Sequence, residues 1–67
     1  MLSARNKFKG TIKAMYVDQV MAEVVVQVGE LEMISLISRE SARRMELKVG
    51  DEVTTVIKST EVIIGKD

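Results

Sequence analysis

Basic and hydroxyl-bearing residues occur in three short segments of the 67-residue chain, near its start, middle and end. A tetrahedral oxyanion offers only hydrogen-bond acceptors, so a pocket for it needs hydroxyl and N–H donors together with positive charge. If the three segments met, they would form a site for a doubly charged oxyanion. Taken singly, each also has an ordinary structural explanation, as a chain terminus, a helix cap or a turn. The candidate oxyanion-binding residues are Ser3, Ala4, Arg5, Asn6, Ser38, Ser41, Lys58 and Ser59.

Catalytic chemistry has little support in the composition. The chain contains no cysteine and no histidine, which excludes disulfides and thiolate zinc sites and removes the commonest general base. Paired carboxylates occur only at Glu30 with Glu32 and at Asp51 with Glu52, beside predicted turns where solvated acids are ordinary. The four glycines are scattered and form no phosphate-binding loop. We therefore expect no catalytic residues, no directly bound metal ion and no enzyme activity.

The charge balance and the aromatic content argue against nucleic acid as the partner. Ten basic and ten acidic residues give a net charge of zero, unlike the basic surface of a nucleic-acid-coating protein. Base stacking needs exposed aromatic platforms. Phe8 and Tyr16 are the only aromatic residues, and we expect both on a buried face. No stretch of about 20 apolar residues suggests a membrane span, and the start lacks the apolar core of a signal peptide. These features favour one cytoplasmic domain covering residues 1–67.

Hydrophobic periodicity predicts a mainly β chain. Phe8, Gly10, Ile12, Ala14 and Tyr16 alternate with polar residues, as on one face of a half-buried strand. Burial on both faces is indicated for the second strand by its central run of three valines. The predicted elements are strands Phe8–Val17, Val20–Val28 and Leu31–Ile37, a helix Arg39–Leu47 capped by Ser38, and strands Glu52–Lys58 and Glu61–Ile64.

This element order suits a small five-stranded Greek-key barrel of the oligonucleotide/oligosaccharide-binding (OB) type, with the helix between strands three and four. A chain this short buries only about 60% of its unfolded surface, so its own core gives marginal stability. With 46% hydrophobic residues and neither disulfides nor a structural metal site, association remains as the stabilising route. We expect a homo-oligomer in which strands are shared between subunits.

Several motifs follow one another along nearly the whole chain. They are Ser3-Ala4-Arg5-Asn6-Lys7 with Gly10, Ala22-Glu23-Val24-Val25, Ile37-Ser38-Arg39-Glu40-Ser41, Leu47-Lys48-Val49-Gly50-Asp51-Glu52-Val53 and Val56-Ile57-Lys58-Ser59-Thr60-Glu61-Val62. In this order the motifs resemble the molbindin (Mop) family of small molybdenum-binding proteins. The same unit, a TOBE-type domain, occurs in transport-linked ATPases and in molybdate-responsive regulators.

The resemblance implies a hexamer built as a trimer of dimers, with molybdate or tungstate bound between subunits for storage or buffering of molybdenum. Ser3 and Arg5, assisted by the Ala4 N–H, would bind together with Lys58 and Ser59. A neighbouring subunit would contribute Ser38 and Ser41. Asn6 matches the motif, with either a binding or a structural role. The family often has threonine at the position of Ser38, which retains the hydroxyl, and a second glycine near Gly29, which this chain lacks.

The sequence is also compatible with two other functions. The run from Leu47 to Val53 also resembles small DNA-binding transition-state-regulator dimers, but that likeness leaves Ser3 to Asn6 unexplained. A purely structural oligomerisation module is the third reading. DNA binding would be strongly salt-dependent and indifferent to molybdate, whereas a structural module would bind neither ligand.

Overall fold

The computed structural model describes residues 5–66. It is mainly β, with four strands in one antiparallel sheet and one short α-helix between the third and fourth strands. This arrangement confirms the predicted OB-like fold class, although the fifth predicted strand is not formed in the described residues. The elements are β1 (Asn6–Val17), β2 (Met21–Val28), β3 (Leu31–Ser38), α1 (Arg39–Arg44), β4 (Glu52–Ile57) and the one-turn 3-10 helix η1 (Ser59–Glu61).

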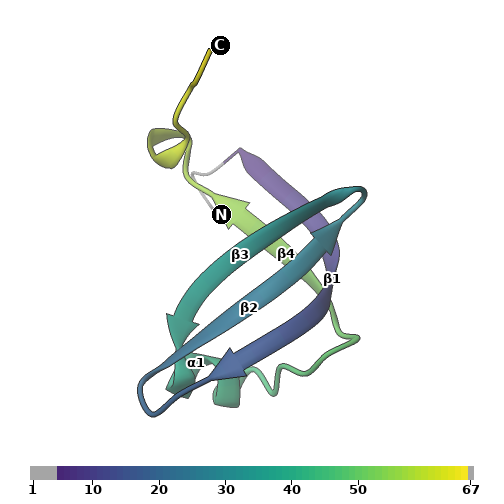
Figure 1. Ribbon diagram of the computed structural model, residues 1–67, viewed down its shortest axis with the longest axis vertical. Coiled ribbons are helices and arrows are strands. Elements are labelled where there is room, and N and C mark those ends of the chain that lie inside the picture. The colour runs from purple at the N-terminus through teal and green to yellow at the C-terminus, as the bar shows by residue number, and fades with distance from the viewer. Residues whose placement is uncertain (1–4, 67) are drawn as a thin grey trace.

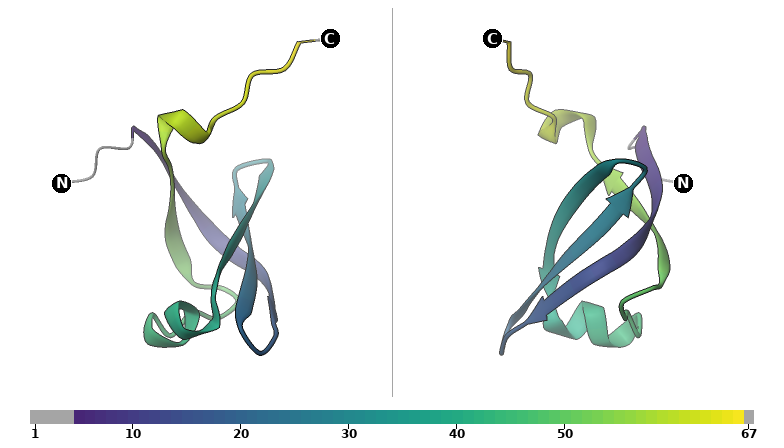
Figure 2. Two further views of the ribbon diagram at one scale, coloured as in Figure 1. Left: turned by 90° about the vertical axis from the view of Figure 1, so that its left-hand side faces the viewer. Right: turned by 45° about the vertical axis from the view of Figure 1, so that its right-hand side comes forward.

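Strand β1 pairs with two different strands along its length. Its first half pairs with β4, from Asn6 opposite Ile57 to Thr11 opposite Glu52. Its second half pairs with β2, beginning with Thr11 opposite Gln27. The sheet order is therefore β3-β2-β1-β4, and the sheet curls so that β4 passes behind β2 and β3 in Figure 1. Figure 2 shows the same curl from two other sides. The result is an open barrel whose free edges are β3 and β4.

Gly10 lies where β1 changes its pairing partner. A Cβ atom at this position would lie 2.6 Å from the backbone oxygen of Gln27 and 2.7 and 2.8 Å from side-chain carbons of Val26 and Val28. These distances are shorter than van der Waals contact, so no larger residue fits without displacing β2. A glycine at a tight bend of a barrel strand allows this close approach.

A small apolar core fills the concave side of the curled sheet. The predicted burial of the Val24–Val26 run on both faces is confirmed, since all three valines are buried. The helix α1 contacts β2 and β3 and buries Ala42. The core consists of Ile12, Val24 and Val26, against which Met15, Val28, Ile37, Leu47 and Val53 pack.

A β-bulge at Lys13 changes which face of β1 points inward. Ile12 pairs with Val26 and Ala14 with Val25, so Lys13 is an extra residue in the ladder. Beyond the bulge Met15 joins the core, whereas Tyr16 is 64% exposed. The prediction that both aromatic side chains lie on the buried face is therefore wrong. Strict alternation fails for Tyr16 after the inserted residue, and Phe8, before the bulge, is itself 40% exposed.

The predicted cap of the helix is confirmed, but its predicted end is not. The Ser38 side chain accepts a hydrogen bond from the Ser41 N–H, as expected of an N-cap residue. The helix ends at Arg44 rather than at Leu47, because Glu46 adopts the left-handed conformation with φ 53°. The Leu47 N–H then donates to the Ala42 oxygen and the Glu46 N–H to the Arg43 oxygen, the bonds of a Schellman motif.

The predicted fifth strand, Glu61–Ile64, is wrong for the described chain. The Glu61 N–H donates to the Lys58 oxygen, and the resulting turn η1 directs the chain away from the sheet. The segment that follows, to residue 66, joins no strand. Within residues 5–66 its side chains enter no core, and Ile63 and Ile64 are 92% and 86% exposed.

Replacing Gly10 should destabilise the fold. We expect Gly10→Ala to lower the free energy of unfolding by about 1–3 kcal/mol, because the added methyl group overpacks the contact between β1 and β2. Chemical denaturation at fixed protein concentration measures the change. Gly65→Ala is the matched control, since an added Cβ there meets no atom within 4 Å. Equal stability of the two variants would contradict the close approach.

Replacing Glu46 by glycine should instead stabilise the fold. Glu46→Gly should raise the free energy of unfolding by about 0.5–1 kcal/mol, because glycine adopts a positive φ without steric cost. Thermal unfolding monitored by circular dichroism is the measurement. Glu40→Gly, in the first turn of α1, should instead be destabilising, and a loss of stability in Glu46→Gly would refute the assigned conformation.

Candidate functional site

Two of the predicted binding segments meet at one end of the β1–β4 pair. Asn6 is opposite Ile57, so Arg5 and Lys58 are the next residues beyond this last pair, one on the side of each strand. Arg5, Lys58 and Ser59 are exposed, and the turn η1 keeps Lys58 and Ser59 at this end of β4. Two cations and a hydroxyl group therefore gather at one edge of the molecule.

Neither of these two cations is neutralised within residues 5–66. The ion pairs in this part of the chain are Lys13 with Glu32, Arg43 with Glu40, and Lys48 with Asp51. Within these residues Arg5 and Lys58 thus have no carboxylate partner. Of the other residues predicted for this half of the site, Asn6 is half-buried in the β1–β4 ladder. Ser3 and Ala4 lie outside the described residues.

The third predicted segment forms a hydroxyl pair at the start of α1. The Ser38 Oγ accepts from the Ser41 N–H at 3.1 Å and donates to the Ser41 Oγ at 2.9 Å. Both side chains are partly buried. Because Ser38 donates to Ser41, the hydroxyl hydrogen of Ser41 is left to donate to a ligand. The chain of hydrogen bonds polarises that O–H group and strengthens it as a donor.

The turn between β1 and β2 holds this hydroxyl pair in place. The Arg39 N–H donates to the Val20 oxygen at 2.8 Å, which ties the start of α1 to that turn. The turn itself is closed by Asp18, whose carboxylate accepts from the N–H groups of Met21 and Val20 at 2.7 and 2.9 Å. The Met21 bond, and then the Val20 bond, lower the pKa of the Asp18 carboxyl, with a smaller contribution from Arg39.

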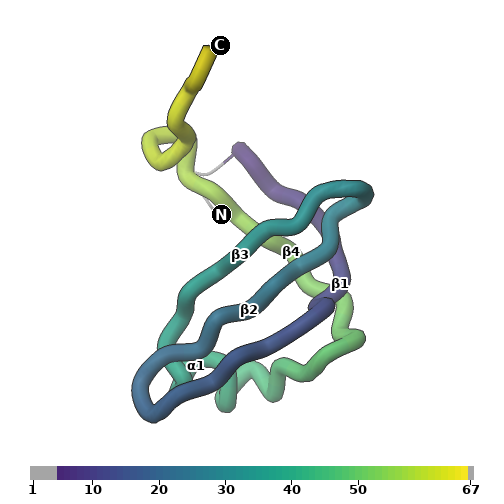
Figure 3. Tube along the Cα trace, viewed as in Figure 1, coloured from purple at the N-terminus to yellow at the C-terminus, as the bar shows by residue number. Residues whose placement is uncertain are grey.

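The described residues of one chain do not bring the two groups together. Arg5 lies just before the start of β1. Ser38 pairs with Met21, the first residue of β2, and therefore lies near the other end of β1. With about 3.3 Å per residue, β1 extends over roughly 35 Å of strand path. Figure 3 shows the start of β1 and the helix at opposite ends of the molecule. The described residues that the sequence predicted therefore form two separate groups, Arg5 with Lys58 and Ser59, and Ser38 with Ser41, which are called half-sites below.

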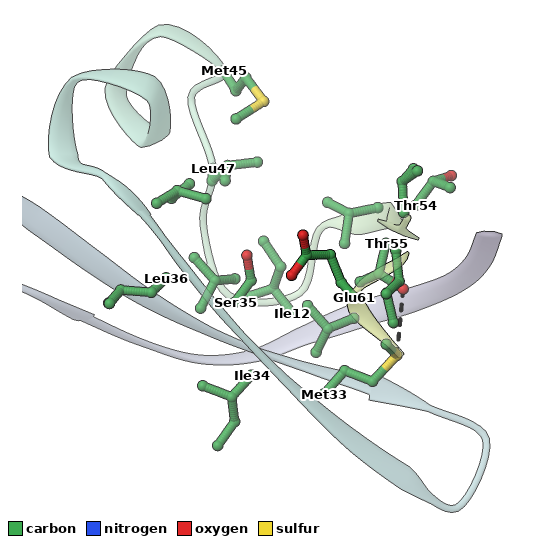
Figure 4. A pocket seen from close by; sticks show the side chains of 16 residues that line it. Ile12, Met33, Ile34, Ser35, Leu36, Met45, Leu47, Thr54, Thr55 and Glu61 are labelled. Atoms are coloured by element: carbon green, nitrogen blue, oxygen red, sulfur yellow. Dashed lines mark hydrogen bonds between the residues drawn. The ribbon is translucent and has the colours of Figure 1, made fainter. Parts of the chain in front are cut away.

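An apolar groove of about 670 Å³ lies between the free edges β3 and β4, and sequence reasoning missed it. Figure 4 shows the side chains that line it, among which the Thr55 hydroxyl donates to the Met33 sulfur at 3.4 Å. The carboxylate of Glu61 points into it. An apolar lining with a carboxylate does not suit an oxyanion. The groove is instead the unclosed side of the barrel, and sequence reasoning missed it because a fifth strand was predicted at Glu61–Ile64.

Other classes of site find no support in residues 5–66. This part of the chain has no cluster of three or more acidic residues able to hold a metal ion. None of its helices is long and apolar enough to cross a membrane.

Comparison with known proteins identifies the family and supports the fold. Residues 2–64 match the TOBE domain model. The chain is 44% identical over 64 residues to molybdenum-pterin-binding protein 3 of Clostridium pasteurianum, covering 94% of each chain. It superimposes on a molybdate-binding protein from Sporomusa ovata with a TM-score of 0.95 and 33% identity, covering 98% of both chains. The cytoplasmic molybdate-binding protein ModG, with molybdate bound, has a TM-score of 0.84 and 41% identity over 87% of this chain and 42% of its own.

The lowered pKa of Asp18 makes its stabilising effect pH-dependent. A folded-state pKa below the ordinary value near 3.8 means that folding favours the carboxylate. The stabilisation is complete above that value and is lost as the pH falls through the lower, folded-state pKa. Asp18→Asn should therefore unfold at a lower temperature than the wild type at pH 7, and the difference should shrink towards pH 2. Thermal unfolding across this range tests it, with Glu30→Gln as the exposed control. A difference that stays constant with pH would contradict the assignment.

Proposed function

The chain belongs to the TOBE-domain family, among the small molybdenum-pterin-binding (molbindin) proteins, and from this membership we propose that it binds molybdate as an intact oxyanion. The named relatives bind molybdenum-pterin or molybdate, which supports the same ligand class here. Tungstate has the same charge and shape, so we propose that it also binds. The function is binding rather than catalysis, and the molybdenum stays within the anion rather than taking protein ligands.

The observation that carries this proposal is the meeting of Arg5 and Lys58 beyond the Asn6–Ile57 pair. One guanidinium and one ammonium group match the two negative charges of the anion. Charge-assisted hydrogen bonds of this kind are roughly twice as strong as neutral ones. In the proposal Ser59, Ser3 and the Ala4 N–H complete this half of the pocket, and Asn6 holds the strand that carries it.

We further propose that Ser38 and Ser41 of a neighbouring subunit complete the pocket. The two half-sites lie at opposite ends of β1, so the contact between subunits joins two different surfaces. Such a head-to-tail contact forms a closed ring or an open filament. A ring that closes agrees with a hexamer assembled as a trimer of dimers. The ligand then cross-links subunits, because neither half supplies enough donors alone.

The apolar groove supports sharing of strands between subunits. Val62, Ile63 and Ile64 are exposed in one chain, while the groove between β3 and β4 is open and apolar. We propose that this segment of one copy closes the barrel of another as its fifth strand. Main-chain bonding to a free sheet edge and burial of alternate side chains would both stabilise the contact.

The proposed role is storage or buffering of molybdate in the cytoplasm by a single domain spanning residues 1–67. Neutral donors around the two cations fix the tetrahedral orientation of the anion. Discrimination against sulfate then depends on the size of the pocket, since charge and shape are shared. The family to which the chain belongs does not favour the DNA-binding alternative.

Removing either cation should weaken binding strongly. We expect Arg5→Ala and Lys58→Ala each to raise the dissociation constant for molybdate about 10- to 100-fold, because a charge-assisted hydrogen bond contributes about 1.5–3 kcal/mol. Lys13→Ala is the control, since Lys13 pairs with Glu32 away from the half-site. Isothermal titration calorimetry gives the three values. Wild-type affinity in all three variants would refute the site.

A further inference from the structure

The outer face of the β1–β4 pair carries more positive charge than the proposed pocket uses. Lys7 is opposite Val56 and Lys9 is opposite Thr54, two and four residues along β1 from Arg5. Both lysines are exposed. Alternation along a strand places residues separated by two on the same face, so Lys7 and Lys9 lie on the face that continues to Arg5 and Lys58.

The acid nearest to these lysines along the ladder lies at the far end of this face. At the end of the β1–β4 ladder away from Arg5, Thr11 is opposite Glu52. Between this pair and Arg5, the residues on the outer face of the two strands are basic or neutral. Within residues 5–66, none of the ion pairs involves Lys7 or Lys9. Because the chain as a whole has no net charge, this gradient of positive charge is a local feature.

We infer that Lys7 and Lys9 form an electrostatic guide that raises the rate at which the oxyanion reaches the Arg5–Lys58 half-site. The inference rests on the proposed function. Lys7 and Lys9 lie roughly 7 and 13 Å along the strand from Arg5 at about 3.3 Å per residue, too far for both to bind the same small anion. A surface of one charge sign concentrates an oppositely charged ligand and accelerates its encounter with the site.

Ionic strength distinguishes guidance from direct binding. The screening length is about 30 Å at 0.01 M salt and about 8 Å at 0.15 M. At low salt both lysines therefore act on an approaching anion, whereas at physiological salt Lys9 lies beyond the screening length. Guidance acts on association and leaves the bound state unchanged, so the dissociation rate should not respond.

The test is stopped-flow kinetics of molybdate binding to the assembled protein. For Lys7→Gln/Lys9→Gln we expect the association rate constant to fall about three- to tenfold at 0.01 M salt and less than about twofold at 0.15 M, with an unchanged dissociation rate. Lys7→Arg/Lys9→Arg should keep the wild-type rate. The control with the same loss of charge is Lys13→Gln/Lys48→Gln, because both of these lysines already pair with carboxylates. It should also keep the wild-type rate.

Three results would overturn the guide. They are an unchanged association rate at low salt, an equal fall in the control, and a dissociation rate that rises as much as the association rate falls. Native mass spectrometry of each variant checks the assembly. If only Lys7→Gln/Lys9→Gln failed to form the oligomer, the two lysines would belong to a subunit contact, and the proposed electrostatic guide would be refuted. A wild-type protein that binds no molybdate would overturn the proposed function and the guide together, whereas binding with unaltered kinetics overturns only the guide.

Discussion

The antiparallel pairing of β1 with β4 is the interaction on which the rest of the molecule depends. It joins the start of the chain to a strand almost fifty residues later, and its last pair leaves Arg5 beside Lys58. β1 passes from β4 to β2 at Gly10 and Thr11, and at Gly10 β2 approaches too closely for any side chain. One glycine thus permits both the curl of the sheet and the meeting of the two cations.

A second constraint is the size of the chain. Only a few apolar side chains are fully buried, while Ile63, Ile64 and the sheet edges remain open. A chain of this length gains stability by association. The same geometry separates the hydroxyl pair from the cation pair by the length of β1. Stability and ligand binding would then have one cause, because the contacts that cover the open apolar surface also assemble the pocket.

The sequence predicted the features that depend on local chemistry. Alternation located the four strands, and Ser38 was identified as the helix cap. The errors arise where a local backbone irregularity or a long-range contact determines the orientation of a side chain or the end of an element. The bulge at Lys13 turned Tyr16 outward, the left-handed Glu46 ended the helix early, and the last predicted strand lacks a partner in its own chain. Spacing alone could not place Arg5 beside Lys58. That expectation came from the family resemblance, and the β1–β4 register supplies its physical basis.

The central claim is that the oxyanion site is assembled from different copies of the chain. Native mass spectrometry with and without molybdate measures subunit number and bound anions in one experiment. The account predicts a hexamer that carries molybdate when the anion is supplied. A monomer that retains no oxyanion, or a monomer that binds molybdate at full affinity, would contradict it.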